Sequence, residues 1–206
     1  GVADTALSVD GSETLSMLTH AATLTQADAA AAQIFGAISG TTGKLTLTSA
    51  QETAAASQTI ASYTGTDSDI AIITAGDQNH TVIFTGAVTT GAVTGTIVID
   101  GDAGNATATL VQVGGNLTGV VTLDDNSGAV TLEMTGDSTT LGQTVNGVGD
   151  GEGILKLSGT GTTVSSAIGK TGTNSLAAID VNGTATFDGA SEATAYTVDA
   201  DTTFTG

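Results

Sequence analysis

The chain of 206 residues has no cysteine, no proline, no tryptophan and no arginine, and its basic residues are Lys44, Lys156 and Lys170. Without cysteine, disulfides and thiolate metal sites are excluded. Without proline, every backbone N–H can join a ladder, which suits strands paired on both edges. So few basic groups cannot neutralise phosphates, and an anionic membrane surface would repel the chain. We therefore expect no nucleic-acid partner.

Aromatic residues are also scarce, because the chain has only four Phe and two Tyr. The hydrophobic content of 39% is nevertheless enough for a core. Valine, isoleucine, leucine, alanine and threonine must do the packing, and these residues suit thin, regularly stacked layers of strands. No apolar run approaches the length needed to span a bilayer, so we expect no membrane insertion by this segment.

The formal net charge is −18, from 21 acidic residues. Such a surface either keeps an exposed protein solvated or offers sites for divalent cations. Most of the acids are isolated or paired rather than grouped in ligand loops, which favours the solvated surface. Together with the lack of cysteine and the scarcity of lysine, this composition is typical of extracellular bacterial proteins. The chain begins at Gly1 rather than Met, as expected of a processed form or an excised fragment.

A short ending recurs along the chain, in which an apolar residue is followed by one small polar residue and then glycine. Examples are Phe84-Thr85-Gly86, Leu157-Ser158-Gly159 and Phe187-Asp188-Gly189. The closing glycines lie at 86, 101, 136, 159, 189 and 206, with gaps of 15, 35, 23, 30 and 17 residues. Uneven gaps of this size are expected when similar units stack with insertions between them.

From about residue 68 the pattern is almost wholly β, in short runs bounded by Gly, Asp or Asn. The predicted strands are 70–73, 81–84, 96–99, 108–113 and 120–123. Either an antiparallel β-sandwich or a β-solenoid would accommodate them. The single repeated ending favours the solenoid, because a sandwich needs hairpins and edge strands that differ from one another.

Residues 1–67 differ from the repeat region, 68–206, and we expect them to cap the end of the stacked sheet. Thr25 and Asp28 have capping-box-like spacing, which predicts a short helix near 26–35. Ser49 and Glu52 repeat the signal and favour a second helix over 53–62. Residues 44–48 alternate as a strand should.

Acidic turns are the candidate metal sites. The candidate calcium ligands are Asp100, Asp102, Asp124, Asp125, Asp150 and Glu152. The segment 148–153 lacks the lysine of a phosphate loop and the spacing of repeated calcium ligands, so a tight turn is its favoured interpretation. The other acids are good turn residues too. Calcium is therefore the only cofactor we carry forward, as a hypothesis.

No catalytic constellation is evident. The two histidines, His20 and His80, lie outside any metal-ligand or nucleophile pattern and are predicted to be surface or loop residues. Stacked β-coils also occur in polysaccharide lyases, but these usually need basic residues, which are nearly absent here.

Inverting glycoside hydrolysis needs only two carboxylates, which Asp124 with Asp125 or Asp100 with Asp102 would supply. No aromatic residue flanks these pairs to hold a sugar ring. We therefore expect turn acids and no catalysis.

The last third of the chain resembles the passenger regions of outer-membrane autotransporters, most closely the rickettsial surface-antigen type. The similarity rests on residues 141–147, on Gly151 to Gly159 (GEGILKLSG), on Ser175 to Val181 (SLAAIDV), and on the strands 184–189 and 193–198. It covers residues 140–206 well and 80–140 loosely. The translocator domain of that family does not follow here, so two readings stay open: a passenger fragment, or the same repeat in a surface-layer or filament subunit.

The resemblance implies an all-β fold, a right-handed parallel β-helix, displayed outside a bacterial cell. The favoured function is structural, as a self-assembling homopolymeric subunit of a surface layer, coat or filament, with acid-rich faces bridged by calcium. The alternatives are an adhesin that binds a glycan, a host or a neighbouring cell, and a carbohydrate-active β-helix enzyme.

Overall fold

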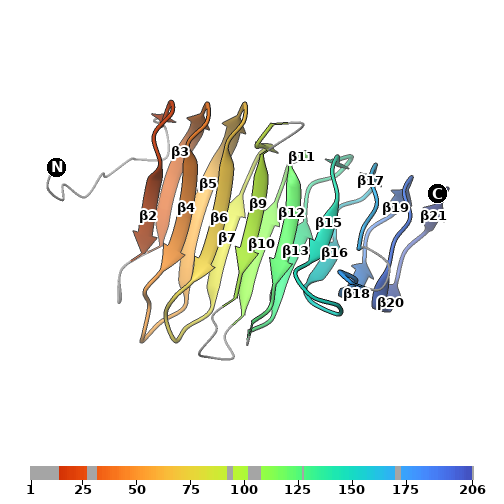
Figure 1. The fold of residues 1–206 in the computed structure, drawn as a ribbon. Coiled ribbons are helices and arrows are strands. Elements are labelled where there is room, and N and C mark those ends of the chain that lie inside the picture. Colours follow the sequence, from red (N-terminus) through yellow and green to blue (C-terminus); the bar gives the residue numbers. More distant parts are fainter. Residues whose placement is uncertain are drawn as a thin grey trace, which may run out of the picture.

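The computed structural model describes residues 14–26, 32–91, 95–101, 108–126, 128–169 and 173–205. Within these ranges the chain is all-β, without a helix, and the paired strands run parallel. The strands stack as successive coils of a β-solenoid, with the N-terminal coils at one end and the C-terminal coils at the other (Figure 1). The predicted solenoid is thus confirmed, and the antiparallel sandwich is excluded. The predicted right hand of the coil stays a prediction.

Each coil contributes to three faces. The long face contains β3 (Gln33–Gly40), β5 (Ala56–Gly65), β7 (His80–Phe84), β10 (Thr109–Val113), β13 (Val130–Met134), β16 (Ile154–Leu157), β18 (Leu176–Val181) and β20 (Ala193–Val198). The short face contains β1 (Leu15–Ser16), β8 (Val88–Thr89), β11 (Leu117–Thr118), β14 (Thr140–Leu141), β17 (Thr162–Val164), β19 (Ala185–Phe187) and β21 (Thr202–Phe204). The third face contains β2 (Ala22–Gln26), β4 (Lys44–Ser49), β6 (Asp69–Thr74), β9 (Thr96–Asp100), β12 (Val120–Asp124) and β15 (Val145–Gly147).

The long and short faces are continuous in the first coils. Strand β5 pairs with β7 through its first half and with β8 through its second half. The two faces therefore form one 15-stranded sheet, and the third face is a separate 6-stranded sheet.

Alternation explains why these segments become strands. In β4, Leu45 and Leu47 are buried while Thr46 and Thr48 between them are partly exposed. Parallel sheets are often apolar on both sides because helices cover them. Here only the inward side is covered, so each strand alternates, and threonine serves the outward side.

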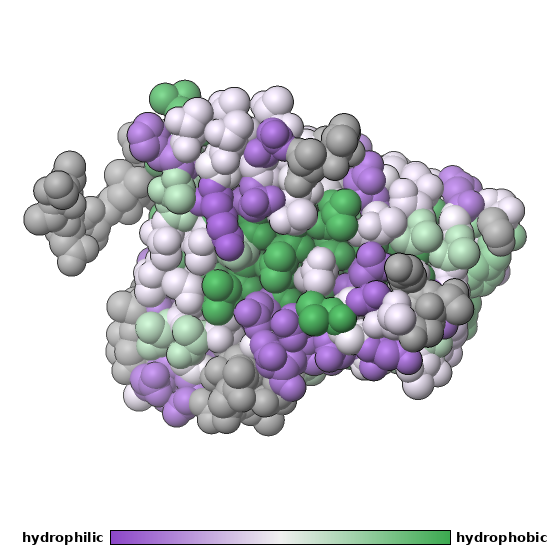
Figure 2. Space-filling model, viewed as in Figure 1, coloured by the Kyte–Doolittle hydropathy of each residue, from purple (hydrophilic) through white to green (hydrophobic). Residues whose placement is uncertain are grey.

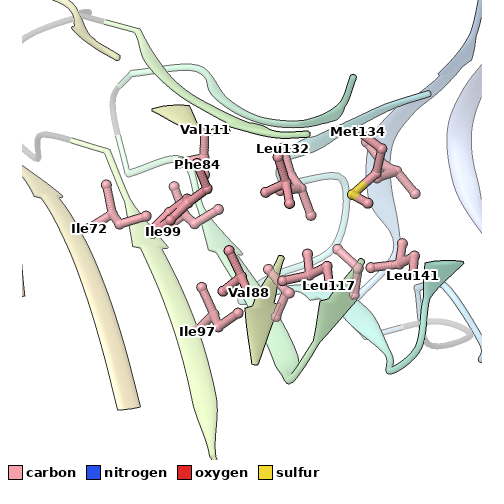
Figure 3. Close-up of a cluster of buried hydrophobic side chains, with 14 of the residues drawn as sticks. Ile72, Phe84, Val88, Ile97, Ile99, Val111, Leu117, Leu132, Met134 and Leu141 are labelled. Atoms are coloured by element: carbon pink, nitrogen blue, oxygen red, sulfur yellow. The ribbon is translucent and has the colours of Figure 1, made fainter. Parts of the chain in front are cut away.

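The core is a set of side-chain rows that run along the solenoid. Register pairing places Val82, Val111, Leu132 and Leu155 in one such row on the long face. Figure 3 shows side chains of the long face opposite a short-face row of Val88, Leu117 and Leu141. Small aliphatic residues suffice because each coil covers the row of the coil before it.

Glycines form a column at the corner between the long and short faces. Gly114, Gly136, Gly159 and Gly183 follow one another, so a coil in this part of the chain takes 22, 23 and 24 residues. A Cβ at Gly136 would lie 2.1 Å from the carbonyl oxygen of Gly114. Only glycine fits this close approach of successive coils.

The uneven gaps between the recurring glycines now have a physical reason. Gly86, Gly136 and Gly159 follow long-face strands, but Gly101 follows a third-face strand and Gly189 a short-face strand. The same short ending therefore closes strands on three different faces. The repeat is more regular than its sequence ending indicates.

The predicted N-terminal helices are wrong. Within 26–35, Gln26 belongs to β2 and Gln33 to Phe35 belong to β3, while residues 27–31 lie outside the described part. Residues 56–65 form β5 rather than a helix. A capping box contributes only about 1 kcal/mol, which pairing on both edges of a central strand outweighs.

Strand pairing continues across the predicted boundary at 67/68. Strand β4 pairs with β6, and β5 pairs with β7 and β8, so both sides belong to the same two sheets. The described residues include no helix long and apolar enough to cross a membrane.

Candidate functional site

The C-terminal end of the solenoid exposes apolar side chains at positions that are buried in the preceding coil. Tyr196 and Val198 of β20 are 43% and 47% exposed, and Phe204 of β21 is 53% exposed. Their register partners one coil earlier are Ile179, Val181 and Phe187, which are all 0% exposed. We call the Tyr196, Val198 and Phe204 set the open end.

The open end keeps the geometry of an interior coil. The ring of Phe204 stacks on that of Phe187 with centroids 5.0 Å apart and planes 15° apart. Strands β20 and β21 pair with β18 and β19 on one edge, and within the described residues no strand pairs with the other edge. Unpaired edges next to apolar side chains are a template for adding another strand.

The opposite end is only partly covered within the described residues. Strand β1 pairs with Ile38 and Ser39 of β3, while the first half of β3 pairs with β5 alone. Ile34 in that first half is 60% exposed. Gln33 donates a hydrogen bond of 3.2 Å from Nε2 to the carbonyl of Thr25.

The solenoid also has an apolar patch on its side. Figure 2 shows hydrophobic residues at the centre of the third face, over β6, β9 and β12, with hydrophilic residues around them. Outward positions on these strands include Ile73, Val98 and Val120, which are all partly exposed.

Two of the predicted calcium ligands lie side by side. Asp100 and Asp124 are register partners on β9 and β12. Asn126 joins them, because its Nδ2 donates to Asp100 Oδ1 at 2.6 Å and its backbone N–H to Asp124 Oδ1 at 3.3 Å. Nδ2 also lies 3.2 Å from the carbonyl oxygen of Gly101. Asn126 thus links two carboxylates that would otherwise repel each other, one through its side-chain amide and the other through its backbone N–H.

The remaining predicted ligands serve turns. Asp125 Oδ1 accepts a hydrogen bond from the N–H of Val130 at 3.0 Å. Glu152 Oε2 accepts one from the N–H of Gly149 at 2.9 Å. Asp150 Oδ1 accepts from the N–H of Ser175 at 3.3 Å and from its hydroxyl.

The structure therefore divides the predicted ligands. It brings together Asp100 and Asp124 and places Asp150 and Glu152 in a different turn, while Asp102 lies outside the described residues. Among the described residues, no group of three or more His, Asp or Glu side chains is placed to hold a metal ion. Calcium binding stays a prediction.

Carboxylates and amides link one coil to the next at several corners. Asp137 Oδ1 accepts from the N–H of Thr160 at 2.8 Å, and Asn116 Oδ1 accepts from the N–H of Thr140 at 2.9 Å. Asp69 Oδ1 accepts from both the N–H and the hydroxyl of Thr96. Corners interrupt the strand ladders, so these side chains satisfy N–H groups that would otherwise have no partner.

Glu133 is the centre of a polar cluster that the sequence did not predict. It lies on the outward side of β13 and is only 8% exposed. Its carboxylate accepts from Ser158 Oγ at 2.5 Å and Gln112 Nε2 at 2.8 Å, and it lies 3.4 Å from Lys156 Nζ. Burial alone would raise the pKa of Glu133, but the Ser158 and Gln112 hydrogen bonds and the Lys156 charge hold it below its ordinary value.

The signal for this cluster is visible only in register. Gln112, Glu133 and Lys156 occupy the same outward position on β10, β13 and β16. They are 21 and 23 residues apart, which has no meaning until the coil length is known. The cluster ties three coils together.

The two histidines differ. His20 is exposed in a turn, as predicted, but the surface prediction is wrong for His80, which is 0% exposed inside the solenoid. The inward side of β7 begins at His80, so the alternation with Val82 and Phe84 is what buries it.

No family model, curated protein or solved structure matches the chain.

Proposed function

We propose that this chain is a structural subunit of an extracellular surface layer, coat or filament, in which copies stack end to end. The observation that carries the proposal is the open end, where an apolar interior row is exposed beside two strand edges that no described strand covers. A second copy that continues the coil would bury this row. The proposal includes no catalysis.

The two ends of the solenoid are complementary in direction. All coils run parallel, so a long-face strand of one copy can continue the long face of another without reversal. We propose that β20 pairs with the first half of β3 in the next copy. Because the two joined surfaces differ, the contact is heterologous, and such contacts give open chains rather than closed dimers.

The expected free energy of association between two stacked copies is small to moderate. Completing the burial of three half-exposed side chains contributes about 1 kcal/mol each. Strand pairing adds directional hydrogen bonds along β20. The net charge of −18 on each copy opposes assembly, so salt or calcium should favour it by screening or bridging the carboxylates.

The experiment introduces one negative charge on either of two apolar surfaces. Val198→Glu places it at the open end, and Val98→Glu places the same change on the lateral patch of the third face. Sedimentation velocity and electron microscopy would follow the 206-residue chain at low salt, at high salt, and with calcium or a chelator. We expect Val198→Glu to abolish stacking and Val98→Glu to leave it intact.

The contrary outcomes are informative. Loss of assembly in Val98→Glu alone would mean lateral packing through the third face and would overturn the end-to-end arrangement. A wild-type chain that stays monomeric under every condition would overturn the structural role.

A further inference from the structure

His80 occupies an unusual position for a titratable group. Its Cα register partners are Ala56 on β5 and Thr109 on β10, so the ring lies between two coils. All three residues are at most 1% exposed. The imidazole is therefore held away from solvent by the coils on both sides.

The hydrogen bonds fix the tautomer of the ring. Gln58 Nε2 donates to the carbonyl of Leu24 at 3.1 Å and to Gln33 Oε1 at 2.7 Å. The Gln58 amide must then present Oε1 to His80, and this oxygen lies 3.0 Å from Nε2 of the ring. His80 Nε2 accordingly carries the proton, and Nδ1 is the basic nitrogen.

Among the described residues, no side chain is placed to accept a hydrogen bond from a second proton on the ring. Nδ1 is buried and has no hydrogen-bond partner of normal geometry among the described residues. Thr74 and Thr109 are occupied with each other, at 2.5 Å between their hydroxyl oxygens. A proton on Nδ1 would place a charge in a dry interior, where the backbone of Ile73 stabilises it only in part, and this is unfavourable.

Among the described residues, the side chains buried around His80 carry no charge. The buried side chains at this corner are polar but neutral: Gln26, Ser49, Gln51, Gln58, Thr74 and Thr109. Asp77, in the turn before β7, and Glu52, in the turn before β5, are exposed. Desolvation lowers the pKa of His80 to about 4, and the backbone of Ile73 offsets part of this effect.

The buried amide and imidazole side chains, Gln26, Gln51, Gln58 and His80, all lie in the N-terminal coils. In the row that contains His80, the next residue after Thr109 is Val130, and the core rows from there onward are dominated by Val, Leu, Ile and Phe. Opening the coils around His80 would therefore affect β2 to β7 first. These are the coils that carry the first half of β3.

We propose that His80 is a proton-sensitive latch: acidification opens the N-terminal coils around it while the apolar C-terminal coils stay closed. As a regulator of assembly the latch rests on the proposed end-to-end stacking, because it would release the β3 edge. As a property of the isolated chain it does not depend on stacking.

The direct test is hydrogen exchange of backbone amides between pH 7 and pH 4, corrected for the intrinsic exchange rate at each pH. The lowering of the His80 pKa from 6.5 to about 4 corresponds to a loss of amide protection on the order of a hundredfold between pH 7 and pH 4. We expect this loss in β5 and β7 and a much smaller one in β13 and β16. His80→Gln removes the titrating group, and His20→Gln, in the exposed turn, is the matched control.

The wild-type protein supplies a readout that needs no variant at His80. Nitrogen chemical shifts of its ring should show a neutral Nε2–H tautomer at pH 7 that persists to about pH 5. Titration near pH 6.5 without loss of protection would overturn the latch. So would equal loss of protection in all coils of wild type and His80→Gln, because carboxylates would then be responsible.

Sedimentation of the same samples separates the two proposals. Filaments that dissolve at pH 4 in wild type and in His20→Gln, but persist in His80→Gln, would support the regulatory role. Local opening without any filament at pH 7 would leave the latch standing and remove the proposed function.

Discussion

Asp100 and Asp124 lie directly opposite each other on adjacent parallel strands, and Asn126 joins their carboxylates through its side-chain amide and its backbone N–H respectively. Like charges in this position normally weaken a sheet. Asn126 offsets the repulsion by donating one hydrogen bond to each, and its backbone adopts a φ of +43°, which asparagine and aspartate tolerate.

Asn126→Asp tests this arrangement. The substitution keeps a residue that accepts the left-handed backbone, but it replaces the amide donor by a third carboxylate. We expect a loss of about 1 kcal/mol in the free energy of unfolding at low salt, because this corner is partly exposed. Calcium should recover more stability in the variant than in wild type. Urea unfolding with calcium or chelator measures both effects, and Asn146→Asp on the same face is the control.

The glycine column is tested by a pair of alanines. At Gly136 a Cβ would lie 2.1 Å from a backbone oxygen of the previous coil, whereas at Gly142 the nearest atom is 3.5 Å away. We expect Gly136→Ala to lower the unfolding free energy by about 2 kcal/mol or more through displacement of a coil. Gly142→Ala should change it by less than about 1 kcal/mol. Equal effects in thermal unfolding would contradict the close stacking at this corner.

Glu133→Gln should destabilise the solenoid by about 1 to 2 kcal/mol at pH 7. The new amide would point a donor at Ser158 or Gln112, and the Lys156 charge would lose its partner. The native carboxylate has a lowered pKa, so its contribution is present above the ordinary pKa of 4.5 and is lost as pH falls through the folded-state pKa. Wild type and variant should therefore converge in urea unfolding once the pH falls below the folded-state pKa of Glu133. A difference in unfolding free energy that persists at low pH would mean that the shape of the Glu133 side chain, rather than its charge, stabilises the fold.

Two stacked phenylalanines should differ in importance. Phe187 is 0% exposed and Phe204 is 53% exposed, although the rings are in contact. Phe187→Ala should cost about 3 to 5 kcal/mol, as expected for a cavity in a core. In a monomeric sample Phe204→Ala should cost less than half of that. A larger effect at Phe204 would mean that the last coil is not peripheral.

The strand pattern of this chain is local and could be predicted. Alternation in 44–48, 70–73, 81–84 and 96–99 identifies β4, β6, β7 and β9 within two residues at each end. The predicted helix over 53–62 is wrong, and the alternation of the strand there is hidden because β5 turns Gln58 inward. A polar residue at an inward position hides the alternation, and only the contacts of Gln58 with Leu24 and Gln33 explain it.

The functional features are non-local and could not be predicted. Glu133, Gln112 and Lys156 meet because the coils place them in register. The burial of His80 depends on which way β7 begins its alternation. The acidic turns could be identified, but the hydrogen bond from Ser175 to Asp150, one coil away, could not be predicted without the coil length.

The most direct measurement for end-to-end stacking is fibre diffraction or electron cryomicroscopy of the assembled chain. Neighbouring coils are separated by about 4.8 Å along the solenoid axis. If copies stack through β20 and the first half of β3, that spacing lies along the filament axis and continues across each joint. A coil spacing perpendicular to the filament axis, with copies joined through the third face, would contradict the account.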